Sequence, residues 1–320
     1  MSNDLVFYAK KFASLRVDRS KGIAPHKPIL VLSVINLFER NLLTRNQIAL
    51  SPELVVTFLK YWHQLGSNSH NADIAMPFFH LTGDGFWHLK AKPGYESVLS
   101  SKVKLRSVRA LREFIHYAYL DDELFRLLRD EIARKSLVNI VVEAWFPEKK
   151  KQVQQLLKID SFQEFQDRLR EQGGAVYKVE DLQDEAKSIV RDAAFRKIVV
   201  SVYEYRCAFC GLQVINSLSQ NILDGAHIKP FAEFYDDRID NGISLCKNHH
   251  WAFDHGWFTI NDDYTVLVSN DLREESLNAK PIKEFQGNYI LVPVQEQYRP
   301  RLEALHWHRE NVFNLSDPLF

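Results

Sequence analysis

The stretch SLCKNHHWAFDHG (residues 244–256) decides the fold of the second half of this 320-residue chain. It places His249 and His250 side by side, three and four positions after Cys246. A histidine three residues after a cysteine has the spacing of two zinc ligands. The second histidine is then left over, so we expect the two neighbours to have different tasks.

The cysteines of the chain complete this pattern. Only three are present, and Cys207 and Cys210 form a C-x2-C pair upstream of Cys246. With His249 they give C-x2-C followed by C-x2-H, a closed set of four ligands of the kind that a structural zinc ion takes. In the reducing cytosol, paired cysteines are more often metal ligands than disulfides. We therefore predict that these four residues bind a structural Zn²⁺.

Polar residues near the zinc ligands indicate a second, catalytic site. The strand-like segment NILDGAHIKP carries Asp224 and His227, and Asn241 follows 14 residues after His227. His250 and Asp254 are four residues apart, so a helix places them on one face. A histidine that removes a proton from water, beside a divalent ion that stabilises charge on a phosphate, is a mechanism for cleaving phosphodiesters.

The motifs RCAFC, DGAHIKP and DNGISLCKNHHWAFDHG, in this order, resemble an HNH endonuclease with a ββα-metal core over about residues 191–270. The resemblance implies that His227 is the general base and that Asn241 orients the base and its loop. It also implies that His250 binds a catalytic Mg²⁺ or Mn²⁺, with Asp254 as a partner on the same helix face. The expected reaction is phosphodiester hydrolysis that leaves a 5′-phosphate and a 3′-hydroxyl.

The chain departs from the family pattern at Ala226, where many HNH enzymes have an aspartate or histidine that binds the metal. Asp224 is the candidate replacement. Strand alternation puts residues 224 and 227 on opposite faces, and a bulge at Gly225 would change this. His227 also has a plainer interpretation as a buried core histidine, and the later Asn-Gly pair as an ordinary turn.

The first half of the chain is expected to be mostly helical with one small hairpin. In SPELVVTFLKYWHQLG, Ser51 is an N-cap, Pro52 takes the first helical position and Gly66 is a stop. PHKPILVLSVINLFER starts another helix, and the pattern from Ser107 to Phe146 is again helical. PFFHLTGDGFWHLK is typical of two aromatic strands joined at Gly83-Asp84-Gly85.

A charged, glutamine-rich stretch (148–178) separates the halves, and Gly173-Gly174 breaks it. A helix over about 180–204 then leads into the cysteines. We predict three parts: a modified-DNA recognition domain (1–147), a helical connector (148–190) and an HNH domain (191–320). The predicted fold class is α+β, with a mostly helical N-terminal domain, a small hairpin and a ββα-metal domain that holds structural zinc.

Three segments of the first domain stand out: LRVDRSKGIAPHKPILVLSVI (15–35), SNSHNADIAMPFFHL (67–81) and GDGFWHL (83–89). The first places basic residues before an apolar helix, and the second ends in a Met-Pro-aromatic run. These features resemble the sulfur-binding domain of phosphorothioate-dependent restriction endonucleases over about residues 5–147. In that family the domain precedes an HNH nuclease, as it does here. The resemblance implies phosphorothioate-modified double-stranded DNA as the partner.

Sulfur in place of a non-bridging phosphate oxygen is larger, softer and less hydrated. An apolar pocket loses little by burying sulfur but is penalised for burying oxygen, while basic side chains hold the backbone charge. The residues expected to contact DNA are Arg19, His26, Lys27, Met76, Pro77 and Phe78. Met76 replaces the aromatic residue that the family usually has before this proline, and methionine is itself soft and apolar. The alternative is that this run only fills the core.

Composition leaves these functions open. The formal net charge is +0, so a global basic signature of DNA binding is missing, although basic residues cluster within 10–27 and 102–112. The longest apolar stretch (28–38) is about half the length of a membrane span. The N-terminal MSNDLVFYAKKF lacks the pattern of a secretion signal, so a cytoplasmic protein is expected.

Together these features predict a modification-dependent restriction endonuclease that acts on phosphorothioated DNA. One alternative keeps the nuclease but lets the first domain read another modification or a DNA shape. A second alternative is a zinc-stabilised sensor that binds modified DNA without cutting it. Cleavage of both strands needs two active sites or two visits, so a homodimer is also considered.

Overall fold

The computed structural model describes residues 3–100, 105–216, 221–275 and 277–313. These residues form two compact units. Unit 1 comprises Met1–Glu164 and Asp184–Val190, and unit 2 comprises Phe165–Gln183 and Arg191–Phe320. The stretch predicted as a connector is therefore divided between the units, and the predicted limits of the functional domains stay predictions.

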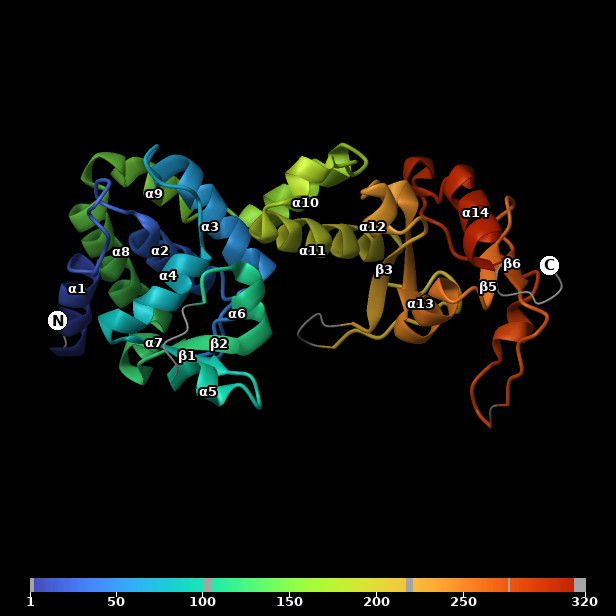
Figure 1. Cartoon of the computed structure of the whole chain (residues 1–320), viewed down its shortest axis with the longest axis horizontal. Helices are drawn as coiled ribbons and strands as arrows, with labels where there is room; N and C mark the ends of the chain where they lie inside the picture. Colours follow the sequence, from blue (N-terminus) through green and yellow to red (C-terminus); the bar gives the residue numbers. More distant parts are fainter. Residues whose placement is uncertain (1–2, 101–104, 217–220, 276, 314–320) are drawn as a thin grey trace. The chain divides into compact units, whose positions relative to one another are not determined.

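Unit 1 is built around helix α2 (His26–Glu39), in which every residue from Pro28 to Phe38 is buried. A helix that is apolar on all sides belongs in a core, and α2 contacts several of its neighbours (Figure 1). The other helices of this unit before the predicted connector are α1 (Asn3–Ala13), α3 (Pro52–Leu65), α4 (Ala75–His80), α5 (Glu96–Ser100), α6 (Val108–Phe114), α7 (Asp122–Arg129) and α8 (Glu131–Trp145).

The limits of α3 follow the prediction. The Ser51 hydroxyl accepts a hydrogen bond from the backbone N–H of Leu54, and Pro52 opens the helix. Gly66 ends it, where an added Cβ would lie 2.5 Å from the carbonyl oxygen of Trp62. The predicted helix is confirmed, including its cap.

The predicted hairpin at Gly83-Asp84-Gly85 is wrong. The first half of that segment forms α4 and a 3₁₀ turn (Leu81–Asp84), and only β1 (Trp87–Ala91) is a strand. Its antiparallel partner is β2 (Ile115–Leu120), in a stretch that the pattern predicted as helical. Asp84 is buried rather than exposed at a turn, because its carboxylate accepts hydrogen bonds from the Arg16 backbone and the Lys27 ammonium.

Three helices occupy the stretch between the predicted domains: α9 (Lys150–Leu156), α10 (Ser161–Glu171) and α11 (Glu185–Val202). The chain ends α10 just before Gly173 and Gly174, as predicted, and both glycines have positive φ. At Gly174 an added Cβ would lie 2.3 Å from the carbonyl oxygen of Asp237. This close approach pins the Gly173-Gly174 turn against the loop that follows β3.

Unit 2 contains the predicted ββα arrangement. Strands β3 (Leu223–His227) and β4 (Gly242–Cys246) pair antiparallel, and α13 (Lys247–Asp254) contacts both strands (Figure 1). Helix α11 packs on the strand pair, since an added Cβ at Gly225 would lie 2.9 Å from the Cα of Arg196. The remaining α-helices and strands of this unit among the described residues are α12 (Phe231–Phe234), β5 (Phe258–Ile260), β6 (Val266–Val268) and α14 (Leu302–His308).

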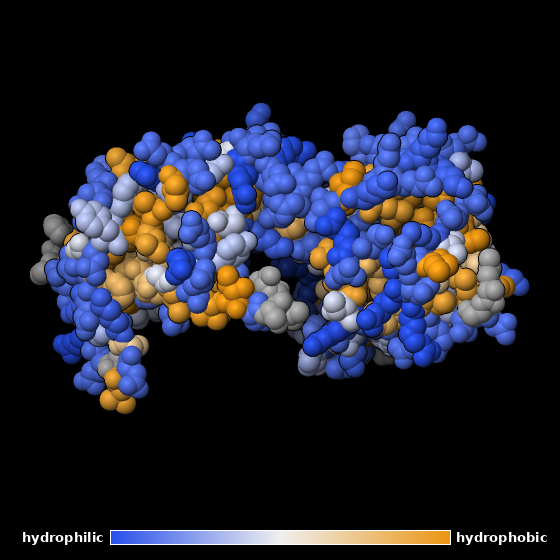
Figure 2. Space-filling view, turned by 180° about the vertical axis from the view of Figure 1, so that it is seen from behind, coloured by the Kyte–Doolittle hydropathy of each residue, from blue (hydrophilic) through white to orange (hydrophobic). Residues whose placement is uncertain are grey.

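The surface of each unit is that of a folded polar domain. Figure 2 shows hydrophilic side chains over most of the viewed face, with smaller apolar patches between them. Within the described ranges, no helix combines the length and the apolar character that crossing a membrane would require.

Candidate active site

The four predicted zinc ligands meet in space. The ligand atoms of Cys207, Cys210, Cys246 and His249 all lie within 4.8 Å of one another. Nδ1 of His249 is 3.1 Å from Sγ of Cys246 and 3.7 Å from Sγ of Cys207. Three thiols and one imidazole are a donor set that suits zinc. The residues present therefore fit the ion that the sequence predicts.

The four side chains of this cluster also interact directly with one another. Hydrogen bonds with Cys210 and Cys246, together with burial, raise the pKa of the Cys207 thiol, whereas bonds with Cys207 and Cys210 lower the pKa of Cys246. Although burial lowers it, hydrogen bonds to Cys210 and Cys246 raise the pKa of His249 to about 9. The ring of His249 also packs on Phe209, with 4.3 Å between ring centroids. The cluster is thus a closed site with a fixed imidazole.

His227 stands at the end of β3 in a closely fitted position. Its ring stacks on Phe195 of α11, with 3.9 Å between centroids and 4° between planes. Its Nε2 lies 2.7 Å from Oδ1 of Asp237, whose Oδ2 accepts a hydrogen bond from Nη1 of Arg191 at 2.8 Å. Sequence reasoning missed Asp237, Arg191 and Phe195. The acidic run YDDRID after the base was the one signal for a carboxylate in this region.

Asn241 ties together the two ends of the loop between β3 and β4. Its side chain is fully buried, and Nδ2 donates to the carbonyl oxygens of Lys229 (3.1 Å) and Asp236 (3.0 Å). Its Oδ1 accepts from the Lys229 backbone N–H at 3.0 Å. Arg301, in the stretch where the sequence offered no motif, pairs with the Asp236 carboxylate at 2.6 Å. The loop that follows the base is therefore held on both sides.

The ring nitrogens of His250 face carboxylates, whereas those of its neighbour His249 face thiols. Nδ1 is 3.4 Å from Oδ2 of Asp224, and Nε2 is 3.4 Å from Oδ2 of Asp254. Burial raises the pKa of Asp254, which the positive charge of nearby histidines partly offsets. An ion bound at either nitrogen of His250 would have one carboxylate beside it.

Asp224 reaches His250 although β3 contains no bulge. The pairing of β3 with β4 is regular from Leu223 to His227. Alternation therefore puts Asp224 on the same face as Ala226, the position where the HNH pattern has its metal ligand. Lys247, on α13, also contacts Asp224 at 3.3 Å. Among described residues, only the Cys₃His cluster brings three or more potential ligand atoms together.

The basic residues predicted to contact DNA occupy different environments. Nζ of Lys27 pairs with Asp84 at 2.6 Å, and both side chains are nearly buried. His26 packs against Trp62 at 4.5 Å between ring centroids, and its Nε2 lies 2.9 Å from the carbonyl oxygen of Asn71. Burial lowers the pKa of His26. Arg19 is exposed.

The Met-Pro-aromatic run lies on α4, which contacts α2. Met76 is 36% exposed, whereas Pro77 is buried and Phe78 is only 1% exposed. The Phe78 ring meets the edge of Trp87 at 5.3 Å, and the Trp87 indole donates to the Phe78 carbonyl oxygen. Met76 is thus the exposed residue of the run, and Phe78 belongs to the core.

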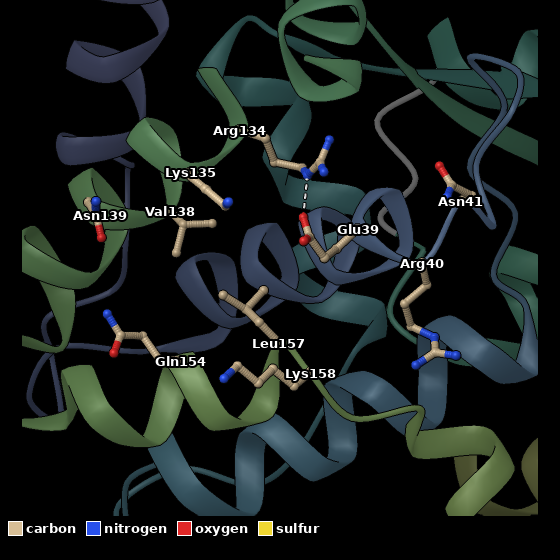
Figure 3. A pocket seen from close by; sticks show the side chains of 10 residues that line it. All are labelled: Glu39, Arg40, Asn41, Arg134, Lys135, Val138, Asn139, Gln154, Leu157 and Lys158. Carbon is tan, nitrogen blue, oxygen red and sulfur yellow. Dashed lines mark hydrogen bonds and ion pairs between the residues drawn. The ribbon is translucent and has the colours of Figure 1, made fainter. Parts of the chain in front are cut away.

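A cleft of about 830 Å³ lies at the other end of α2, lined by Glu39, Arg40, Lys135 and Lys158 among others (Figure 3). Most of its cations have partners. Arg134 pairs with Glu39 at 2.6 Å, Arg40 with Asp160 and Lys135 with Glu131. None of the predicted site residues lines this cleft.

Two family comparisons agree with this geometry. Residues 207–261 match the model of the HNH endonuclease family. This range includes His227, His250 and the Cys₃His cluster of Cys207, Cys210, Cys246 and His249. The chain therefore contains an HNH endonuclease domain that includes residues 207–261. Residues 8–159 match the ScoMcrA-like DNA sulfur-binding domain family. The chain combines a ScoMcrA-like sulfur-binding domain with an HNH endonuclease domain.

Solved structures give partial likenesses. The modification-dependent restriction endonuclease TagI is 24% identical with a TM-score of 0.29, over 38% of this chain and 38% of its own. The sulfur-binding domain of ScoMcrA complexed with phosphorothioated DNA is 19% identical with a TM-score of 0.37, over 47% of this chain and 98% of its own. A ScoMcrA structure with sulfur-binding and SRA domains is 19% identical with a TM-score of 0.35, over 43% of this chain and 42% of its own. No curated protein matches the chain.

Proposed function

We propose that the chain is a modification-dependent endonuclease that recognises phosphorothioated double-stranded DNA and hydrolyses its phosphodiester bonds. The observation that carries this proposal is the placement of His227, Asn241 and His250 on a ββα core, in a chain whose first half matches sulfur-binding domains. Recognition is assigned to residues 1–147 and cleavage to residues 191–320, with a helical connector between them.

In the proposed mechanism, His227 removes a proton from the attacking water. Stacking on Phe195 holds the imidazole, and Asn241 holds the loop that follows it. His250 would hold Mg²⁺ or Mn²⁺ together with Asp224 or Asp254, since imidazole and carboxylate oxygen suit these ions. When bound, the ion would stabilise negative charge on the phosphate and on the departing 3′ oxygen.

In this proposal the Cys₃His cluster (Cys207, Cys210, Cys246 and His249) has a structural role. Four ligands close the coordination sphere of zinc and leave no position for water or substrate. Cys207 and Cys210 precede β3, whereas Cys246 and His249 connect β4 to α13. A zinc ion at this point would join the two ends of the catalytic core.

For recognition, we assign the sulfur contact to the exposed Met76 beside Pro77. A soft apolar surface loses little by desolvating sulfur and disfavours a hydrated phosphate oxygen. Phe78 would support this surface from beneath, and Arg19 and His26 would lie near the phosphate backbone. Lys27 acts on the DNA less directly, because Asp84 already neutralises its charge.

The test is a cleavage assay on two plasmids that differ only in phosphorothioation, with Mg²⁺ or Mn²⁺ and with His227→Ala as control. The proposal predicts cleavage of the modified plasmid alone, lost in the variant. Equal cleavage of both plasmids would keep the nuclease and remove the sulfur recognition. Tight binding to the modified plasmid without cleavage would favour a sensor, for which the missing ligand at Ala226 gives a reason.

Cleavage of both strands at once would favour a homodimer, and light scattering would check this oligomeric state.

A further inference from the structure

We propose that Asp237 is the positioning residue of the general base, and that Arg191 holds it in place. Asp237 would fix the orientation of the His227 ring and keep its proton on Nε2, so that Nδ1 is the nitrogen that accepts the proton from water. This inference rests on the proposed function, in which His227 is the base.

The contact between the two side chains defines the tautomer. Nε2 of His227 lies 2.7 Å from Oδ1 of Asp237, and the Asp237 side chain is 3% exposed. An ionised carboxylate only accepts hydrogen bonds, so Nε2 must carry the hydrogen. The other nitrogen of a neutral imidazole is then an acceptor, which a general base requires.

Arg191 completes the arrangement from α11. Its Nη1 donates to Oδ2 of Asp237 at 2.8 Å, so each carboxylate oxygen has its own partner. The guanidinium lies 3.6 Å from the ring centroid of Phe231, and the Arg191 side chain is 12% exposed. Arginine can only donate, so Oδ2 of Asp237 is held as an acceptor, and the aromatic ring restricts where the guanidinium can lie.

The backbone around Asp237 is also fixed. Its N–H donates to the carbonyl oxygen of Ala175 at 2.8 Å, and its carbonyl oxygen lies against Gly174. Stacking on Phe195 sets the plane of the His227 ring, and the bond to Asp237 sets its rotation within that plane. Orientation and tautomer of the base are thus determined by residues that the HNH motif does not contain.

The isosteric variant Asp237→Asn gives the sharpest test. Arginine can only donate, so the new amide would turn its oxygen to Arg191 and present its NH₂ to His227. Nε2 would then have to accept, and the proton would move to Nδ1. We expect the side-chain ¹⁵N spectrum of His227 to show this exchange of tautomers, and the cleavage rate to fall roughly 10²- to 10⁴-fold, as when the carboxylate behind a catalytic histidine is lost.

Asp240→Asn is the matched control. Asp240 lies on the same loop and also pairs with an arginine, Arg301, at 2.8 Å, but it does not contact His227. This variant should keep the tautomer and most of the activity. The His227 signal is assigned by its loss in His227→Gln, which distinguishes it from the other histidines of the chain.

The tautomer of His227 in the protein without substitutions tests the proposal even if Asp237→Asn does not fold. A neutral His227 with its proton on Nε2 supports the proposal, whereas a proton on Nδ1 overturns it. Asp237→Asn with an unchanged tautomer and an unchanged rate would also overturn it. If the protein shows the expected tautomer but cleaves no DNA, the proposed function fails, whereas cleavage by a protein whose His227 carries its proton on Nδ1 overturns the positioning role alone.

Discussion

His249 and His250 are neighbours in sequence but occupy sites of opposite character. The His249 ring packs on Phe209, and its Nδ1 faces sulfur atoms in a closed set of four ligands. His250 is 26% exposed and faces one carboxylate on each side, without a closed set. Closed sets of soft ligands hold structural ions, and open sets leave room for substrate. A single residue step along α13 therefore separates the cluster that we propose holds a structural ion from the site that we propose acts on DNA.

Cys246→Ser would test the structural side of this comparison and has the largest expected effect. Apparent binding free energies of structural zinc are roughly 10 kcal/mol or more, as large as the stability of many domains. We expect loss of bound zinc and unfolding of unit 2, measured by metal analysis and thermal unfolding. A variant that keeps its zinc and its melting temperature would contradict a structural role.

His250→Ala should have the opposite effect, with a loss of cleavage but little change in zinc content or stability. It removes the proposed ligand of the catalytic ion, so cleavage should fall by roughly 10²- to 10⁴-fold, because such an ion contributes several kcal/mol to transition-state stabilisation. The zinc content and the melting temperature should stay close to those of the unchanged protein. Loss of zinc in this variant would show that the two sites are not separate.

A third histidine, His308, extends the comparison because both of its ring nitrogens have hydrogen-bond partners within the protein. It stacks on Phe253 at 3.7 Å, and its nitrogens lie near the Thr259 hydroxyl and the Phe253 carbonyl oxygen. Burial lowers the pKa of His308 from 6.5 to about 4. The unfolded chain therefore binds a proton that the folded chain does not. Its contribution is fully present above about pH 6.5 and is lost as the pH falls toward 4, by about 3 kcal/mol.

Urea unfolding between pH 7 and pH 4 measures this loss. His308→Gln should flatten the pH dependence, whereas His306→Gln, an exposed histidine on the same helix, should leave it unchanged. If the free energy of unfolding changes equally with pH in all three proteins, His308 is not the source of the pH dependence.

Asp224→Asn and Asp254→Asn have the smallest expected effects and divide the site further. Each changes one carboxylate beside one nitrogen of His250. The variant that removes the ligand should raise the Mn²⁺ concentration required for cleavage by about 10- to 100-fold, and the other should change it little. Titration of the cleavage rate with Mn²⁺ distinguishes them, and two unaffected variants would exclude both residues as ligands.

The parts of the molecule that short-range spacing determines could be predicted. The four predicted metal ligands form two pairs that are each three residues apart, Ser51 caps the helix that it precedes, and the ββα order follows from continuous segments. The coarse fold, helices with small sheets and an HNH domain, was predictable for the same reason.

The errors and omissions depend on long-range contacts. The hairpin prediction failed because β1 pairs with β2 across an intervening pair of helices, and because Lys27 draws Asp84 into the interior. Asp237 was missed because its role depends on Arg191, from a helix far back in the sequence. Neither the periodicity of apolar residues nor the spacing of motifs in the sequence reports such contacts. Asp224 shares its face of β3 with Ala226 and not with His227, so it can take the place of the ligand missing at Ala226 without a bulge.

X-ray absorption at the zinc edge tests the separation of His249 from His250 most directly. The account predicts a coordination of three sulfur atoms at about 2.3 Å and one nitrogen at about 2.0 Å, with the same spectrum in His250→Ala. A shell with fewer sulfur atoms, or a spectrum that changes when His250 is removed, would contradict it.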